Sequence, residues 1–189
     1  YIGDGWHSTT GYKICCAHEE ESELKKKLDN ANIEFSIDNY PTVKQFNLFK
    51  SNTELIDVLS RCGEGADSKH LPPECFNWSK DSLQSLVDGY MDADGTISKK
   101  EQYRFNTVSY TLAQELMVVL RTLGYTPTCY HNKRGGKSVI LGRDVHVKDR
   151  YEVYYYKNSE HSKYVHEDND GMWTYGLKTT KVEPQTVYN

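Results

Sequence analysis

The sequence predicts an α+β fold built from a duplicated helix–strand–strand–helix–strand unit. Two stretches with the same order of strand and helix periodicity lie about ninety residues apart, at residues 12–37 and 103–131. Between them lies an apolar helix that ends in two carboxylates, at residues 79–95. An internal repeat of this kind predicts two structurally similar halves.

The first copy begins with an alternating segment, residues 12–17, which is typical of a strand. A helix is expected over residues 19–30, with Leu24 and Leu28 on one face and acidic residues in its first turn, where the helix dipole favours them. Residues 33–37 predict a further strand, and residues 52–62 predict a short helix before a glycine-rich loop.

The central helix has apolar residues at steps of three and four. Ser79 and its neighbours supply N-cap side chains, and Gly95 is expected to end the helix. Gly89 and Ala93 lie one turn apart, so another backbone could approach closely on that side. Asp92 and Asp94 lie at the negative end of the helix dipole, where a cation would offset the electrostatic cost. We therefore expect a metal site there.

The second copy repeats the first. Residues 103–108 predict a strand, residues 110–123 a helix that closes at Gly124, and residues 125–131 the next strand. The equivalent pairs are Tyr12 with Tyr103, Lys13 with Arg104, Leu24 with Leu116 and Leu28 with Leu120. A later strand-rich region, 145–156, places Tyr151, Val153 and Tyr155 on one face.

The charge distribution is uneven. The net charge is −4, but the formal balance is −8 over residues 1–94, +6 over 95–165 and −2 over 166–189. A basic middle segment is typical of a surface that follows phosphates, although an ordinary solvated face has the same composition. Five cysteines without a Cys-x-x-Cys pair argue against zinc and for a reducing compartment. We expect a cytoplasmic or nucleoid-associated protein that is not secreted.

One interpretation of the helix end is a calcium-binding loop. Residues 90–101 resemble an EF-hand, with Asp92, Asp94 and Glu101 at ligand positions. Tyr90 occupies the first ligand position, however, and residues 102–109 predict a strand where an EF-hand continues as a helix. The EF-hand remains an alternative of another functional class.

Residues 87–95, Val-Asp-Gly-Tyr-Met-Asp-Ala-Asp-Gly, resemble the motif of the LAGLIDADG homing endonucleases, with Asp88 in place of a small residue. Residues 1–5 align with 91–95 and resemble the end of a first copy, so the chain is expected to be a fragment. Residues 68–74, with Lys69, and residues 109–124 resemble further blocks of intein-encoded members. Residues 176–189 resemble the opening of an intein's C-terminal splicing block.

The resemblance implies the LAGLIDADG homing endonuclease fold, with duplicated α-β-β-α-β-(β)-α units related by pseudo-twofold symmetry and two DNA-binding antiparallel sheets. It implies a first half over 1–78, truncated in its motif helix, a second half over 79–165, and the splicing block from 166 to 189. The two motif helices would pack through Gly3, Gly89 and Ala93. Asp4 and Asp94 would be the catalytic carboxylates that hold Mg²⁺, with the carbonyls of Gly3 and Ala93 as further ligands.

The resemblance also implies a metal-dependent double-strand break in DNA that drives intein homing. Lys69 would assist catalysis, and Lys157 or Lys163 would be its second-half counterpart. We expect a monomer whose partners are double-stranded DNA and the host protein that flanks the intein. The candidate DNA-contacting residues are Trp6, Lys13, Tyr103, Arg104, Lys133, Arg134, Lys137 and Arg143. A decayed endonuclease, an RNA-splicing maturase and a remnant that only splices remain alternatives.

Overall fold

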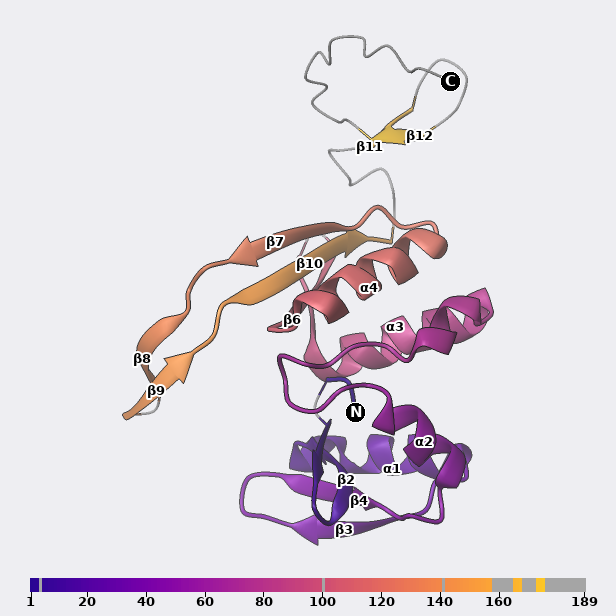
Figure 1. Ribbon diagram of the computed structural model, residues 1–189, viewed down its shortest axis with the longest axis vertical. Helices are drawn as coiled ribbons and strands as arrows, with labels where there is room; N and C mark the ends of the chain where they lie inside the picture. The colour runs from indigo at the N-terminus through magenta and orange to yellow at the C-terminus, as the bar shows by residue number, and fades with distance from the viewer. Residues whose placement is uncertain (4, 100, 141, 158–164, 168–172, 176–189) are drawn as a thin grey trace, which may run out of the picture.

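The computed structural model describes residues 1–3, 5–99, 101–140, 142–157, 165–167 and 173–175. It consists of two halves, each with a four-stranded antiparallel sheet covered on one face by helices (Figure 1). A long linker joins them. No helix in this described part of the chain is both long and apolar enough to cross a membrane.

The first half contains β1 (Gly5–Ser8), β2 (Gly11–Cys16), β3 (Phe35–Asn39) and β4 (Lys44–Leu48) in the spatial order β1-β2-β4-β3. Its helices are α1 (Glu21–Asn30), preceded by the short 3-10 helix η1 (His18–Glu20), and α2 (Thr53–Ser60). The core of this half lies between the sheet and these helices, and its buried residues are Tyr12, Leu28, Phe46, Leu48 and Leu59.

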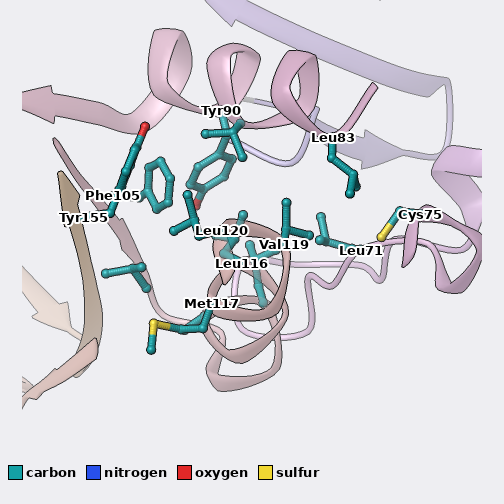
Figure 2. Close-up of a cluster of buried hydrophobic side chains, with 14 residues drawn as sticks. Leu71, Cys75, Leu83, Tyr90, Phe105, Leu116, Met117, Val119, Leu120 and Tyr155 are labelled. Atoms are coloured by element: carbon teal, nitrogen blue, oxygen red, sulfur yellow. The ribbon is translucent and has the colours of Figure 1, made fainter. Parts of the chain in front are cut away.

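The second half repeats this order with β5 (Gly95–Ile97), β6 (Gln102–Thr107), β10 (Arg150–Tyr156) and β7 (Thr128–Asn132). The helices are α3 (Lys80–Asp94) and α4 (Tyr110–Thr122). Their facing sides and the sheet enclose the larger core, in which Tyr90 of α3, Leu120 of α4 and Phe105 of β6 come together (Figure 2).

Matching registers relate the two sheets. Lys13 pairs with Trp6 and Asn47 in the first sheet. Arg104 pairs with Thr96 and Tyr154 in the second. The predicted equivalence of Lys13 with Arg104 therefore holds in strand register, and it extends to strand pairs that the sequence did not reveal.

Both motif-helix ends are as expected. Ser79 caps α3, accepting a hydrogen bond from the backbone N–H of Ser82 at 3.2 Å, and Gly95 follows its last residue. The short strands β1, β4 and β5 were not predicted, because apolar alternation over so few residues is a weak signal. β4 nevertheless supplies Phe46, which is fully buried.

Five further elements complete the described part of the chain. The linker includes the 3-10 helix η2 (Pro73–Asn77). Between β7 and β10 in the sequence, β8 (Gly136–Ile140) and β9 (Arg143–Val147) form a separate two-stranded ribbon, which extends away from the helices (Figure 1). Of residues 130–137, which the sequence predicts as a basic turn between strands, 130–132 belong to β7 and 136–137 to β8, so Lys133 and Arg134 lie between these two strands. β11 (Val165–Glu167) pairs with β12 (Trp173–Tyr175).

Candidate functional site

The end of α3 meets a helical turn formed by the first residues of the chain. The backbone N–H of Gly5 donates to the carbonyl of Tyr1 at 3.0 Å, the four-residue spacing of an α-helix. A Cβ atom placed on Gly3 would lie 2.6 Å from the Cβ of Ala93 and 3.0 Å from a carboxylate oxygen of Asp94. The two segments thus approach through small residues, as the sequence predicted for Gly3 and Ala93.

Lys69 holds this turn in place. Its ammonium donates to the carbonyl oxygens of Tyr1 (3.1 Å), Ile2 (3.0 Å), Gly3 (2.8 Å) and Gly5 (2.8 Å), and the residue is only 8% exposed. A cation at this position satisfies carbonyls that a helix end leaves without partners. The structure therefore shows Lys69 as a residue that positions the turn.

The linker around Lys69 is anchored on the second half. The hydroxyl of Ser109, at the start of α4, donates to the carbonyl of Lys69 at 2.6 Å. The backbone N–H of Leu71 donates to the carboxylate of Glu115 at 2.6 Å. Lys69 thus connects the turn of the first half to the helix of the second. Only the charge and the block resemblance of Lys69 could be read from the sequence, and its catalytic role stays a prediction.

A cavity of about 210 Å³ opens where these elements meet. Gly3, Lys69 and Asp94, three predicted site residues, line it. Arg150 at the start of β10 and Asn106 near the end of β6 also line it. Sequence analysis did not single out these two, because only the strand pairing brings them beside α3.

The donor set around the cavity fits one part of the metal prediction. Asp94 is a half-buried carboxylate, the oxygen ligand that Mg²⁺ prefers. Asp4 lies outside the described residues. Gly3 fits less well than expected, because its carbonyl oxygen already accepts from the Lys69 ammonium, and that positive charge repels a second cation. Within the described residues there is no cluster of three or more His, Cys, Asp or Glu side chains.

The small-residue face of α3 is only partly covered. Gly3 contacts Ala93, but a Cβ placed on Gly89 would meet no atom within 4 Å. Gly89 and Ala93 line a groove of about 340 Å³ together with Ile14, Leu24 and other residues of the first half. Among the described residues no other segment lies within 4 Å of a Cβ placed on Gly89, and its predicted interface role stays a prediction.

The EF-hand interpretation is wrong. α3 ends at Asp94, and β5 and β6 follow where an exiting helix would be required. Asp92 forms an ion pair with Lys27 of α1 at 2.7 Å. Glu101 lies in a tight turn with a φ of 55°, between β5 and β6.

The predicted DNA-contacting residues fall on different surfaces. Lys13 and Arg104 lie on the sheet faces that point away from the helices, as does Trp6, which is paired with Lys13. Tyr103 does not share this face, because its ring stacks on Tyr155 and packs against the core. Strand alternation puts neighbours such as Tyr103 and Arg104 on opposite faces, so Tyr103 does not lie on the face that carries Arg104, and its DNA contact stays a prediction.

The remaining basic candidates lie farther from the cavity. Lys133, Arg134 and Lys137 are exposed at the base of the β8–β9 ribbon. Arg143 begins β9, but its side chain is outside the described residues. Of the two candidate counterparts of Lys69, Lys157 lies 3.8 Å from Asp88 and over the ring of Tyr103, and Lys163 is outside the described residues.

A buried carboxylate organises the open face of the second sheet. Glu152 is 8% exposed and accepts from Asn132 (2.9 Å), Arg150 (2.9 and 2.8 Å) and Tyr154 (2.6 Å). The bond from Tyr154, together with those from Asn132 and Arg150, lowers the pKa of Glu152 to about 2, against the opposing effect of burial. The carboxylate therefore stays ionised at neutral pH.

Comparison with known proteins identifies a similar domain in the second half of the chain. Residues 81–162 match the model of the LAGLIDADG-like domain. The chain is 33% identical over 94 residues to the iron–sulfur cluster assembly SufBD family protein Rv1461 of Mycobacterium tuberculosis, covering 48% of this chain and 11% of that protein. It is 32% identical over 78 residues to the ATP-dependent DNA helicase Hel308 of Thermococcus kodakarensis, covering 38% of this chain and 7% of the helicase.

The chain thus spans about a tenth or less of the length of these curated relatives. Among solved structures, mesophilic variants of the homing endonuclease I-DmoI superpose with a TM-score of 0.52 at 13% identity, over 82% of this chain and 83% of theirs. I-DmoI in complex with DNA and Mn superposes with a TM-score of 0.51, also at 13% identity, over 82% and 83%. Residues 81–162 therefore match the LAGLIDADG-like domain, and the fold of both halves is similar to that of the homing endonuclease I-DmoI.

Proposed function

We propose that this chain is a site-specific endonuclease that makes a metal-dependent double-strand break in DNA. The observation that carries the proposal is the cavity in which Asp94 of α3 meets the Gly3 turn, beside the ends of strands from the second sheet. The same fold binds target DNA in I-DmoI complexes that contain Mg, Mn or Ca. A carboxylate at the end of a buried helix is the kind of group that such chemistry requires.

Each half contributes distinct parts. Asp94 would hold Mg²⁺ together with Asp4, whose role rests on the sequence resemblance alone. When bound, the metal would supply Lewis-acid charge and a water of lowered pKa. Lys69 holds the Gly3 turn, which packs against the end of α3. The open faces of the two sheets, with Lys13 and Arg104, would lie along the DNA and contact phosphates and bases.

We infer further that the endonuclease is encoded within an intein. Two relatives with unrelated names, an iron–sulfur assembly protein and a helicase, each contain a segment similar to this chain in about a tenth or less of their length. Such a segment is independent of either host's activity, as expected for an inserted mobile element. The resemblance of residues 68–74 to an intein block supports the same inference. A protein with this role acts where the chromosome is.

The test is selection followed by cleavage. The chain is incubated with randomised DNA duplexes and Ca²⁺, bound duplexes are recovered, and Mg²⁺ is added. We expect cutting of both strands at one enriched sequence. Asp94→Asn should slow cleavage by about 10²–10³-fold, the scale for removal of one charge-stabilising group, with binding retained within about tenfold.

The neighbouring Asp92 provides the matched control, because it is exposed and paired with Lys27 away from the cavity. Asp92→Asn should cut at the wild-type rate. Equal activity of Asp94→Asn and the wild type would remove Asp94 from the mechanism. Binding without any cut by the wild type would instead support a decayed or maturase-like protein, and failure to bind any duplex would refute a DNA-directed function.

A further inference from the structure

Two cationic side chains line the cavity that contains Asp94, and they differ in availability. Lys69 is buried and its ammonium already contacts four carbonyl oxygens. Arg150 has a side chain that is 40% exposed. Its Nε and one Nη donate to Glu152, while no bond to the other Nη is seen within the described residues. Arg150 is therefore the cation with donors left to offer a ligand.

Glu152 fixes the direction of the Arg150 side chain. Two of the guanidinium donors contact one carboxylate oxygen at 2.9 and 2.8 Å, and Tyr154 and Asn132 hold the carboxylate from other sides. A planar guanidinium held at two points has little rotational freedom. Its remaining donors therefore keep a defined position at the cavity instead of sweeping through solvent.

This arrangement exists in one half only. The strand registers place Gln45 of β4 where β10 has Glu152, because Gln45 pairs with Cys15 and Asp38 as Glu152 pairs with Asn106 and Tyr130. By the same register Val43 stands where the second half has Arg150. Gln45 is also buried and hydrogen-bonded, so the fold accepts a neutral amide at this position. The charged Glu152–Arg150 pair is an addition that the architecture does not require.

The cavity wall beside Arg150 also has an acceptor without a partner. The side-chain oxygen of Asn106 is buried and makes no hydrogen bond within the described part of the chain. Asn106 lines the cavity with Arg150 and Asp94. An unpartnered buried acceptor is costly, and a water or ligand donor in the cavity would satisfy it. The site is thus polar on the side that faces Asp94.

We propose that Arg150 is a phosphate-contacting residue of the cleavage site and that Glu152 is its positioning residue. The guanidinium donates to a phosphodiester oxygen at the cavity that holds Asp94, where it stabilises charge that develops as the phosphate is attacked. The proposal rests on the proposed endonuclease function and names the second-half cation of that site.

The experiment uses the duplex enriched by selection and compares Arg150→Met, Arg150→Lys and Glu152→Gln with the wild type. Binding is measured in Ca²⁺ and single-turnover cleavage in Mg²⁺. We expect Arg150→Met to cut about 10²–10³-fold more slowly with binding within about tenfold, and Arg150→Lys to recover part of the rate. Glu152→Gln should cut about tenfold more slowly, because the Arg150 guanidinium remains but is no longer held in position. Arg121→Met, on the exposed last turn of α4, is the control and should cut normally.

A second readout needs no cleavage. Phosphates of the duplex are replaced one at a time by uncharged methylphosphonates, and binding by the wild type and by Arg150→Met is compared. At one or two phosphate positions the replacement should weaken duplex binding by the wild type but not by Arg150→Met, since the variant already lacks that contact. The assignment is overturned if no such position exists, or if Arg150→Met alters sequence preference without slowing cleavage. A wild type that binds no duplex would remove the proposed function itself and this assignment with it.

Discussion

The two halves share one strand order but differ in how they are held together. The second half has a fifteen-residue helix, α3, whose side chains complete a core shared with α4 and the sheet. At the equivalent place of the first half the described residues form a helical turn, and the buried core that they build consists of five residues of the sheet, α1 and α2. The strand order is therefore duplicated, whereas the helix packing that stabilises the core of each half is not.

The stability of the first half therefore depends on its contacts with the second half. Its turn is held by Lys69 from a linker anchored on α4, and α1 is tied to α3 by the pair of Lys27 and Asp92. The exposed Lys27–Asp92 pair contributes little to stability. The buried Lys69 contacts are thus the main polar connection between the halves. On unfolding, these contacts should be lost before the core of the second half opens.

The largest expected effect comes from truncating a buried aromatic side chain in either core. Phe105→Ala should lower the free energy of unfolding of the whole molecule by about 3–5 kcal/mol, because Phe105 is fully buried between α3 and β10. Phe46→Ala removes an equally buried ring from the first half only. Hydrogen exchange should then show open amides in β2 and β4 with α4 still protected. Simultaneous loss of protection in both halves after Phe46→Ala would contradict the dependence argued above.

Removal of Lys69 is expected to have the next largest effect. Lys69→Met keeps the aliphatic chain but removes the buried ammonium that donates to four carbonyl oxygens, which should cost about 3 kcal/mol. Thermal unfolding measures this. Lys157→Met is the matched control in the second half, because Lys157 is 47% exposed and 3.8 Å from Asp88, and it should change stability by less than about 0.5 kcal/mol. Equal losses would mean that Lys69 is not the connection between the halves.

The repeat was readable from the sequence because it lies in long periodic segments. The spacing of Leu24 and Leu28, and of Leu116 and Leu120, gave the helices, and the offset of Lys13 from Arg104 matches the register of the sheets. The strand β4 was missed because its alternation is too short to separate from a loop. Its place between β2 and β3 is set by pairing across the chain, which periodicity does not reveal.

The candidate site was predicted only where chemistry lies within a motif. Gly3, Ala93 and Asp94 meet as expected, because a helix end carries them. Arg150 was missed because its approach to α3 follows from strand order, and Tyr103 was misplaced by one step of alternation. The bonding of Lys69 to carbonyls was equally invisible, since the sequence shows a charge but not what surrounds it.

A smaller effect, on the pH dependence of stability, is expected to distinguish Glu152 in the second sheet from Gln45 at the equivalent position of the first sheet. Hydrogen bonds from Tyr154, Asn132 and Arg150 lower the pKa of Glu152 to about 2 against the opposing effect of burial, which is below the pKa in an unfolded chain. Its contribution, on the order of 2 kcal/mol, is present above the unfolded pKa and is lost as the pH falls from about 5 toward 2. Glu152→Gln should flatten that part of the stability profile measured by denaturant unfolding. The control is Gln45→Ala, which should lower stability without changing its pH dependence, because an amide does not titrate.

The smallest effects are opposite in sign at two glycines of the motif helices. Gly3→Ala would place a Cβ 2.6 Å from that of Ala93, so the turn must move away from α3 at a cost of about 1–2 kcal/mol. Gly89→Ala meets no atom within 4 Å and replaces a glycine inside a helix, which should stabilise α3 by about 0.5–1 kcal/mol. Thermal unfolding of the two variants measures both. If Gly89→Ala were destabilising instead, the groove beside α3 would have to be occupied in solution, and the first half would then contain a helix contact that this structure lacks.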